Sequence, residues 1–253
     1  MRVALVQHDV CFEDAPATLE RLTPKVQAAA AEGAGLILLT EMFATGFSMA
    51  TDRVAEPAGS GPGSRFLAER AAATGAVVAG SLPVLDPGAD RPVNRFVFAF
   101  PDGTTASYDK LHPFSFGGED RHYAAGNQLV QLRLGDLAVT PFVCYDLRFA
   151  DAFWSVADRT DAYVLVANWP APRQRHFRAL AIARAIENQA YLLATNRVGR
   201  GGGIDYAGGS LVVDPFGEVL AEAGGNEEIL LVDVDPGRVA DVRHRYRFLA
   251  DRR

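Results

Sequence analysis

Short, mostly apolar runs recur along this chain and restrict its possible folds more than any other feature of the sequence. Residues 3–6, 36–39 and 162–167 contain no charged side chain and are rich in valine, leucine and alanine. Continuous apolar runs of this length predict strands that are buried on both faces. Apolar residues at helical spacing separate the early runs, at residues 19–29 and 66–73. The first third of the chain therefore alternates strands with helices.

The middle of the chain predicts an antiparallel hairpin. Residues 93–100 and 104–109 flank Pro101-Asp102-Gly103, a combination of residues that favours a tight turn. Four further strands are expected near the C-terminus, at residues 191–196, 211–214, 218–221 and 229–233. This mixture predicts an α/β fold with mixed sheets layered with helices, not a doubly wound parallel sheet. Because no linker or repeat divides the chain, we expect one domain over residues 1–253.

One long helix is predicted over residues 174–191. Its apolar stripe is expected to consist of Ala179, Ile182, Ala183, Ile186 and Ala190. On its polar edge, the i, i+3 spacing of Arg184 and Glu187 allows an ion pair. We interpret Arg184, Glu187 and Asn188 as structural residues that support the neighbouring strand ends.

Composition and charge narrow the class of function. The formal net charge is -6, which provides no basic surface for nucleic acid or for an anionic membrane. No run approaches the roughly 18 apolar residues of a membrane helix, and no secretory signal is visible. The two cysteines, Cys11 and Cys144, form no CxxC pair and no zinc spacing with the five histidines. We therefore expect a reduced, cytoplasmic setting and a small-molecule substrate.

Three chemically active residues follow three of the predicted strands: Glu41, Lys110 and Cys144. A thiol with its usual pKa of about 8.5 is mostly protonated at neutral pH, so its attack on a carbonyl needs a base. A carboxylate can accept that proton, and an ammonium group can stabilise the resulting oxyanion. Taken alone, the positions of these residues favour a buried cysteine and a surface ion pair over a catalytic role.

Four segments in register resemble the nitrilase, or carbon–nitrogen hydrolase, superfamily. They are Leu39-Thr40-Glu41-Met42-Phe43, Tyr108-Asp109-Lys110-Leu111-His112, Val143-Cys144-Tyr145-Asp146-Leu147-Arg148-Phe149 and Ala183-Arg184-Ala185-Ile186-Glu187-Asn188. The resemblance implies Glu41 as general base, Lys110 as oxyanion stabiliser and Cys144 as nucleophile. It further implies the backbone N–H of Tyr145 as second oxyanion donor and Glu119 as a second carboxylate. Its implied fold is a four-layer α-β-β-α sandwich that forms a homodimer and requires no metal ion and no organic cofactor.

Other segments resemble the omega-amidase branch of that superfamily. They are Phe43-Ala44-Thr45-Gly46-Phe47, Lys110-Leu111-His112-Pro113-Phe114, Gly118-Glu119-Asp120-Arg121-His122-Tyr123 and Ala167-Asn168-Trp169-Pro170-Ala171-Pro172-Arg173. The branch implies hydrolysis of the terminal amide of 2-oxoglutaramate to 2-oxoglutarate and ammonia, through a cysteine thioester. A substrate of this kind needs a cation for its carboxylate, and Arg148 is the first candidate, with Arg173 as the second. An ion pair between Arg148 and Glu187 is an equal alternative. The expected pocket wall is aromatic, made of Phe43, Phe116, Tyr123 and Trp169.

Several alternatives stay open at this point. Another amidase of the superfamily, or an N-carbamoyl amino acid amidohydrolase, would use the same three residues. A binding or scaffold protein with an inactive site would not need all three, and a thiol redox sensor would usually have a resolving cysteine close to Cys144, where no sequence cue places Cys11. His112 or His122 could belong to a Cys–His–acid triad. Residues 243–248 at the basic, aromatic C-terminus fit either an interfacial tail or a solvated helix.

Overall fold

Two mixed β-sheets form the centre of the protein in the computed structural model, which describes residues 1–252. The strands of the first sheet, in spatial order, are β15 (Glu228–Asp233), β1 (Arg2–Gln7), β2 (Leu36–Leu38), β4 (Val77–Leu85), β5 (Val93–Ala99) and β6 (Thr105–Asp109), with β3 (Glu56–Pro57) beside β4. Those of the second are β14 (Val219–Glu222), β13 (Leu211–Val213), β10 (Tyr191–Asn196), β9 (Ala162–Ala167), β8 (Leu137–Val143) and β7 (Leu132–Leu134). In each sheet the central strands run parallel and the outer strands are antiparallel, except that the short β3 runs parallel to β4.

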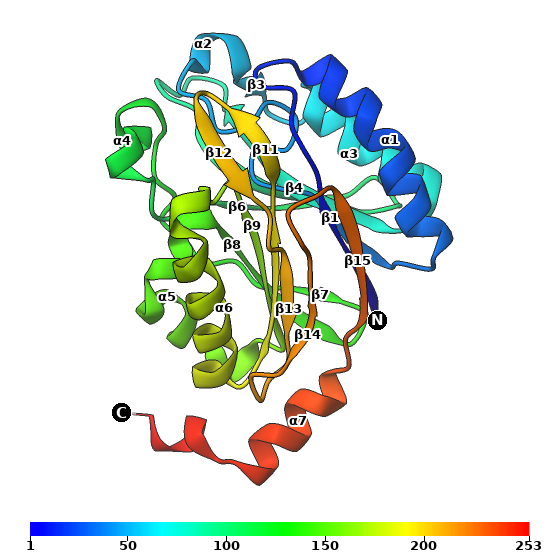
Figure 1. Cartoon of the computed structure of the whole chain (residues 1–253), viewed down its shortest axis with the longest axis vertical. Helices are drawn as coiled ribbons and strands as arrows, with labels where there is room; N and C mark the ends of the chain where they lie inside the picture. Colours follow the sequence, from blue (N-terminus) through cyan, green and yellow to red (C-terminus); the bar gives the residue numbers. More distant parts are fainter. Residues whose placement is uncertain (253) are drawn as a thin grey trace.

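Helices cover the outer face of each sheet (Figure 1). The first sheet lies against α1 (Ala15–Ala31) and α3 (Pro62–Thr74), and the second lies against α6 (Gln174–Asn188) with α5 (Ala150–Trp154) beside it. Short helices occupy the connections, namely α2 (Thr51–Val54), α4 (Glu119–His122), η1 (Ser115–Gly117), η2 (Cys144–Arg148), η3 (Ala157–Arg159) and η4 (Ala171–Arg173). The chain ends in α7 (Pro236–Arg245) and η5 (Phe248–Asp251). The predicted four-layer α-β-β-α arrangement is therefore confirmed.

The apolar runs are continuous because both faces of their strands are buried. In β1, Val3 and Leu5 pack into the core between the two sheets, whereas Ala4 and Val6 pack under α1 and α3. The neighbouring strand repeats the pattern, with Leu36 pointing into the core between the sheets. Successive side chains of a strand point to opposite faces, so a strand between two layers needs apolar residues at every position.

The face that α6 buries differs from the prediction. Ile186 is 48% exposed and Ala179 is exposed, although both were expected in the apolar stripe. The buried residues are instead Phe177, Ala181, Arg184, Ala185 and Asn188. The polar members turn inward because Arg184 has a partner there: its Nε and Nη2 donate to the carbonyl oxygen of Leu147 in η2, at 3.1 and 2.9 Å. The predicted ion pair between Arg184 and Glu187 is confirmed at 2.8 Å.

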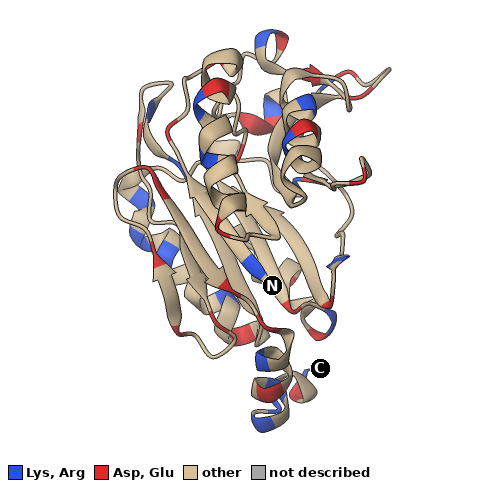
Figure 2. Ribbon diagram, turned by 90° about the vertical axis from the view of Figure 1, so that its right-hand side faces the viewer, with Lys and Arg blue, Asp and Glu red and all other residues tan. Residues whose placement is uncertain are grey.

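Charged residues lie mainly on helices, loops and strand edges, with both signs interspersed (Figure 2). Between Met1 and Arg252, none of the helices combines the length and the apolar character needed to cross a bilayer. Among the few charged side chains that are buried, Glu41, Lys110 and Glu119 contact one another.

Candidate active site

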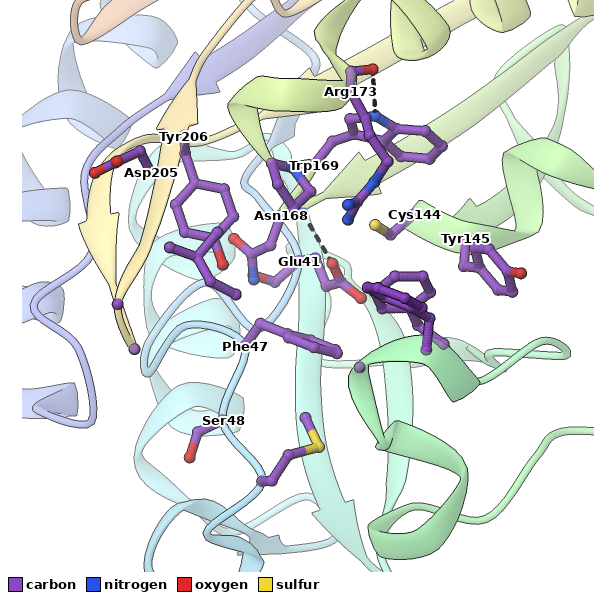
Figure 3. A pocket seen from close by; sticks show the side chains of 18 of the residues that line it. Glu41, Phe47, Ser48, Cys144, Tyr145, Asn168, Trp169, Arg173, Asp205 and Tyr206 are labelled. Carbon is purple, nitrogen blue, oxygen red and sulfur yellow. Dashed lines mark hydrogen bonds between the residues drawn. The ribbon is translucent and has the colours of Figure 1, made fainter.

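The two sheets bring Glu41, Lys110 and Cys144 to one cavity (Figure 3). Glu41 lies just after β2, Lys110 directly follows β6, and Cys144 is the first residue of η2 after β8. All three line a cavity of about 780 Å³. Residues that are far apart in sequence meet here because the strands that precede them end close together at the interface between the sheets.

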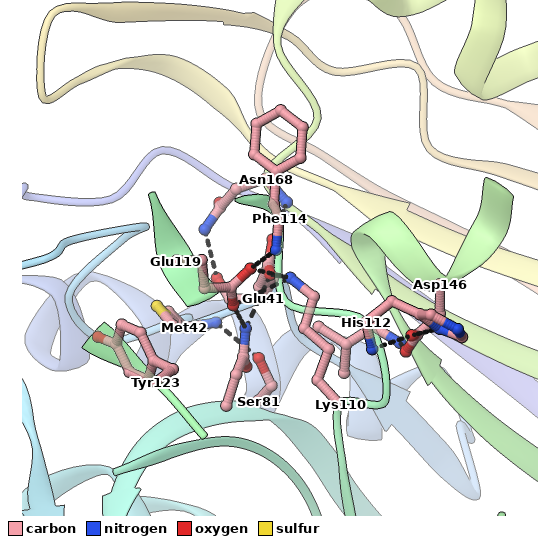
Figure 4. A network of polar contacts seen from close by, with 12 residues as sticks. Glu41, Met42, Ser81, Lys110, His112, Phe114, Glu119, Tyr123, Asp146 and Asn168 are labelled. Carbon is pink, nitrogen blue, oxygen red and sulfur yellow. Dashed lines mark hydrogen bonds and ion pairs between the residues drawn. The ribbon is translucent and has the colours of Figure 1, made fainter. Parts of the chain in front are cut away.

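Lys110 lies between two carboxylates (Figure 4). Its Nζ donates to Glu41 Oε1 at 2.9 Å and to Glu119 Oε1 and Oε2 at 3.1 and 2.8 Å, and all three side chains are buried. Burial alone opposes the charge of Lys110, but the charges of Glu119 and Glu41 outweigh it and raise the pKa of Lys110. Burial, with the negative charge of Glu41, raises the pKa of Glu119, while Lys110 opposes that change. The lysine is therefore a permanent cation beside the thiol.

The second oxygen of Glu41 is held by the chain that follows β9. Asn168 donates its backbone N–H to Glu41 Oε2 at 2.8 Å and its side-chain amide to the carbonyl oxygen of Glu41 at 2.9 Å. Asn94, from β5, donates to Glu41 Oε1 at 2.9 Å. Asn168 lies in one of the segments that resemble the omega-amidase branch. Asn94 was not predicted, because one polar residue near the start of a strand carries no distinguishing signal.

Cys144 begins η2 with an unusual backbone. Its φ is +44°, a left-handed conformation that costs a residue with a Cβ atom about 1 to 3 kcal/mol. Met42, beside Glu41, has a φ of +41°. Burial, followed by the charge of Glu41, raises the pKa of the Cys144 thiol well above its ordinary value. At neutral pH the thiol is therefore protonated, and it must lose its proton to a neighbouring base as it attacks.

Asp146 fixes the turn that carries Cys144. This buried carboxylate accepts the backbone N–H of Val143 at 3.0 Å and the hydroxyl of Tyr108 at 2.8 Å on Oδ2. On Oδ1 it accepts the backbone N–H of His112 at 3.0 Å, with His112 Nδ1 at 2.8 Å. The turn after β8 is thereby tied to the segment that carries Lys110. His112, a candidate for a Cys–His–acid triad, is engaged by Asp146 and does not line the cavity.

Tyr145, the expected second oxyanion donor, lies next to the nucleophile in η2. The first backbone N–H groups of a helix have no partner within that helix, so they are available to an anionic oxygen. Tyr145 and Lys110 both line the cavity beside Cys144. The arrangement supplies one charged and one neutral donor to the same space.

Both candidate arginines line the cavity. The Arg148 guanidinium lies 4.9 Å from the centre of the Trp169 ring, and its Nη2 is 3.3 Å from His176 Nδ1. The Arg173 guanidinium lies 5.4 Å from the centre of the Phe114 ring. Glu187, the alternative partner of Arg148, pairs with Arg184 instead. Within residues 1–252, neither Arg148 nor Arg173 forms an ion pair with an acidic side chain, so both cations stay available to a ligand.

Of the four aromatic residues expected in the cavity wall, two line the cavity. Trp169 and Phe116 line the cavity. Phe43 does not, because it is fully buried against Phe66 in the core under α1 and α3. Tyr123 does not either, because it is buried and its hydroxyl donates to the carbonyl oxygen of Ser48 at 2.7 Å. Their places are taken by side chains that the sequence analysis did not select, among them Phe12, Phe47, Phe114 and Tyr206.

A hairpin that the sequence did not predict closes one side of the cavity (Figure 3). It consists of β11 (Val198–Gly201) and β12 (Ile204–Ala207), and its turn residues Gly202 and Gly203 have φ values of +58° and +80°. Because each strand has only four residues, and β11 contains two glycines, the sequence shows no clear strand signal there. The hairpin contributes Ile204, Asp205 and Tyr206 to the cavity wall.

Comparison with known proteins is consistent with this geometry. The sequence profile of the family described as carbon–nitrogen hydrolase matches residues 2–244. The chain belongs to the carbon–nitrogen hydrolase family. It is 36% identical over 252 residues to the omega-amidase YafV of Escherichia coli K12, covering 99% of this chain and 95% of that protein. It is 34% identical over 216 residues to the 2-oxoglutaramate amidase of Bacillus subtilis, covering 83% and 82%.

A solved structure has the same fold over its whole length. A CN-hydrolase superfamily protein from Xanthomonas campestris, which carries an arsenic adduct in its active site, superposes with a TM-score of 0.93 at 32% identity. The match covers 100% of this chain and 97% of that protein. This chain is accordingly an enzyme that hydrolyses carbon–nitrogen bonds of amides.

Replacing Asp146 by asparagine should destabilise the turn that carries Cys144. An amide has one acceptor oxygen instead of two, so two of the four donors around Asp146 lose their partner. Each buried unpaired donor costs about 1 to 3 kcal/mol, and we expect Asp146→Asn to lower the free energy of unfolding by about 2 to 4 kcal/mol. Urea unfolding measures this loss. Asp136→Asn, at an exposed turn, is the matched control, and equal stability of the two variants would contradict the assignment.

Proposed function

We propose that this enzyme hydrolyses the terminal amide of 2-oxoglutaramate to give 2-oxoglutarate and ammonia. The observation that carries the proposal is the meeting, in one cavity, of Cys144 and two arginines without acidic partners among the described residues. An omega-amide of a dicarboxylate has an amide at one end and a carboxylate at the other, which matches this arrangement. The names of the Escherichia coli and Bacillus subtilis relatives support the same substrate.

In the first half of the proposed reaction, Cys144 is acylated. Its Sγ forms a bond to the amide carbon while its proton passes to Glu41. The carbonyl electron pair moves onto oxygen, and Lys110 Nζ and the Tyr145 N–H stabilise the resulting oxyanion. Collapse of this intermediate breaks the carbon–nitrogen bond, Glu41 returns the proton to the departing nitrogen, and ammonia leaves a thioester on Cys144.

In the second half, water releases the acid. Glu41 accepts a proton from water as its oxygen attacks the thioester carbon, and the same two donors hold the new oxyanion. Collapse expels the Cys144 sulfur, which recovers its proton from Glu41, and the carboxylic acid product departs. Glu119 contacts Lys110 and not the cavity, so its proposed role is to hold the lysine in place.

Arg148 and Arg173 are the proposed partners of the substrate carboxylate. A guanidinium group binds a carboxylate through two parallel hydrogen bonds and stays charged at every physiological pH. Stacking against Trp169 and Phe114 holds the two side chains at the cavity wall without neutralising them. The aromatic surfaces around them exclude water and strengthen the interaction.

Other substrates and a non-enzymatic role are weaker candidates. An N-carbamoyl amino acid also presents a carboxylate, and a simple amide would need neither arginine. A scaffold protein would gain little from Glu41, Lys110 and Glu119, because burying charges costs several kcal/mol per ion before pairing compensates. A cluster of this kind is retained where chemistry requires it.

The proposal also covers the cellular location of the enzyme and its assembly into a homodimer. We place the enzyme in the cytoplasm, with no nucleic-acid partner, on the basis of its net charge of -6 and its two unpaired cysteines. A homodimer is favoured by stacked aromatic side chains near the C-terminus, where Phe216 and Phe248 are 49% and 57% exposed on either side of Tyr246. Arg243 in the same segment binds carbonyl oxygens of its own chain, so it supports α7 and not a partner.

Ammonia release tests the substrate and the nucleophile together. We expect faster turnover of 2-oxoglutaramate than of glutamine, asparagine, succinamate, an N-carbamoyl amino acid or a simple nitrile. Cys144→Ala should abolish turnover, because the thioester cannot form, while the matched variant Cys11→Ala should retain it. Preference for another amide would keep the nucleophile and reject the substrate. Full activity of Cys144→Ala would reject both the nucleophile and the mechanism.

The two arginines should determine KM for carboxylate substrates. We expect Arg148→Met or Arg173→Met to raise KM for 2-oxoglutaramate at least tenfold, with kcat changed less than threefold, since the carboxylate is bound equally in substrate and transition state. Steady-state kinetics should show no such rise for a simple neutral amide. Arg175→Met, which removes an exposed arginine outside the cavity wall, is the control. Unchanged KM in both cavity variants would place the carboxylate elsewhere.

A further inference from the structure

Asn94 joins the two carboxylates of the active site by its side chain. Its Nδ2 lies 2.9 Å from Glu41 Oε1 and 3.0 Å from Glu119 Oε1. An amide nitrogen carries two hydrogen atoms, so each carboxylate receives one. Asn94 is 1% exposed, and its Oδ1 is buried without a hydrogen-bond partner among the described residues. A buried acceptor without a partner is costly, which indicates that the contacts of the nitrogen outweigh that cost.

The backbone of Asn94 holds the third member of the cluster. Its carbonyl oxygen accepts the backbone N–H of Lys110 at 3.0 Å, which extends the pairing of β5 with β6 by one step. One residue therefore contacts Glu41, Glu119 and Lys110. No other side chain in the described part of the chain donates to both carboxylates except that of Lys110 itself.

The cluster needs a neutral donor because its charges do not balance. Two carboxylates face one ammonium group, and two like charges close together in a buried site favour uptake of a proton by one of them. A protonated Glu41 could not accept the proton of Cys144. The Asn94 amide stabilises the ionised form of both carboxylates without adding a charge, because an N–H group binds an anionic oxygen more strongly than the oxygen of a neutral carboxyl group.

Asn94 also determines which oxygen of Glu41 is free to act. Glu41 Oε1 accepts from both Asn94 and Lys110, at 2.9 Å each. Oε2 accepts only the backbone N–H of Asn168. Oε2, which accepts fewer hydrogen bonds, is therefore the better base. The two contacts on Oε1 prevent the carboxylate from rotating.

We propose that Asn94 is a positioning residue that stabilises the buried carboxylate pair and orients Glu41 as the base for Cys144. This inference concerns the activation of the Cys144 thiol. It rests on the proposed function only where 2-oxoglutaramate is named as the substrate. Other titratable groups also face the carboxylates: Lys110 after β6, Cys144 in η2, Tyr123 after α4 and Tyr206 in β12. Of these, the Tyr123 hydroxyl donates to the carbonyl oxygen of Ser48 and not to either carboxylate.

Alkylation of Cys144 by iodoacetamide tests the proposal without any amide substrate. In this reaction the Cys144 sulfur bonds to the reagent's methylene carbon, iodide leaves, and the thiol proton passes to Glu41 and then to solvent. The rate of Cys144 alkylation should fall as the pH is lowered, once the pair of Glu41 and Glu119 takes up a proton. Measurements in a Cys11→Ser background, read by mass spectrometry of the Cys144 peptide, confine the signal to one thiol.

Asn94→Leu keeps the approximate size of the side chain and removes both donors. We expect the acid limb of the alkylation profile to move to higher pH by about one unit or more, with about a tenfold or larger loss of rate at pH values below both limbs. Asn94→Asp, which replaces the donor by a third carboxyl group, should move the limb in the same direction and provides the test if the leucine variant fails to fold. Thr195→Val, another buried polar-to-apolar change in a strand, should leave the profile unchanged.

Profiles of both folded Asn94 variants that superpose on the wild-type profile would overturn the proposal, whatever their effect on stability. A shifted profile in an enzyme that does not turn over 2-oxoglutaramate would uphold the role of Asn94 and reject the proposed substrate. The two conclusions therefore fail separately.

Discussion

The ion pairs of Lys110 with Glu41 and Glu119 are the interaction on which the rest of the site depends. Charged groups lose their hydration when they are buried, and only close, well-oriented partners restore the lost free energy. Here each charge is within 3.1 Å of an opposite charge, and neutral donors from Asn94, Asn168 and the backbone of Phe114 complete the shell. The cluster provides a fixed electrostatic environment before any substrate binds, which is the condition for efficient stabilisation of a developing oxyanion.

The two-sheet frame makes this cluster possible. Glu41, Lys110 and Glu119 come from the first sheet and its connections, whereas Cys144 comes from the second. Asp146 and Arg184 join the frame at the turn after β8, so the left-handed backbone at Cys144 is held from both sides. Strain at such a position persists only when the surrounding contacts determine it. Through these contacts, the packed apolar layers also fix the position of the Cys144 thiol.

The fold and the centre of the site could be predicted because they depend on strong, local signals. The apolar runs before Glu41 and Cys144 and the turn signature before Lys110 predicted strands, and the structure places strands there. The prediction of the buried face of α6 was wrong, because hydrophobicity alone cannot show that Arg184 and Asn188 turn inward to backbone carbonyls and side-chain partners. Phe43 was misplaced for a related reason, since an aromatic residue beside an active-site motif packs into the core as readily as into a cavity. No sequence pattern indicates a role for Asn94 or for the hairpin of β11 and β12, because their roles depend only on tertiary contacts.

Trapping of the acyl-enzyme tests the central claim most directly, namely that the charge cluster serves covalent chemistry at Cys144. The enzyme would be mixed with 2-oxoglutaramate, quenched in acid within milliseconds and analysed by mass spectrometry. We predict an added mass equal to that of the substrate minus ammonia, located on the Cys144 peptide and removed by hydroxylamine. Turnover without any adduct on Cys144, or an adduct on another residue, would contradict the account.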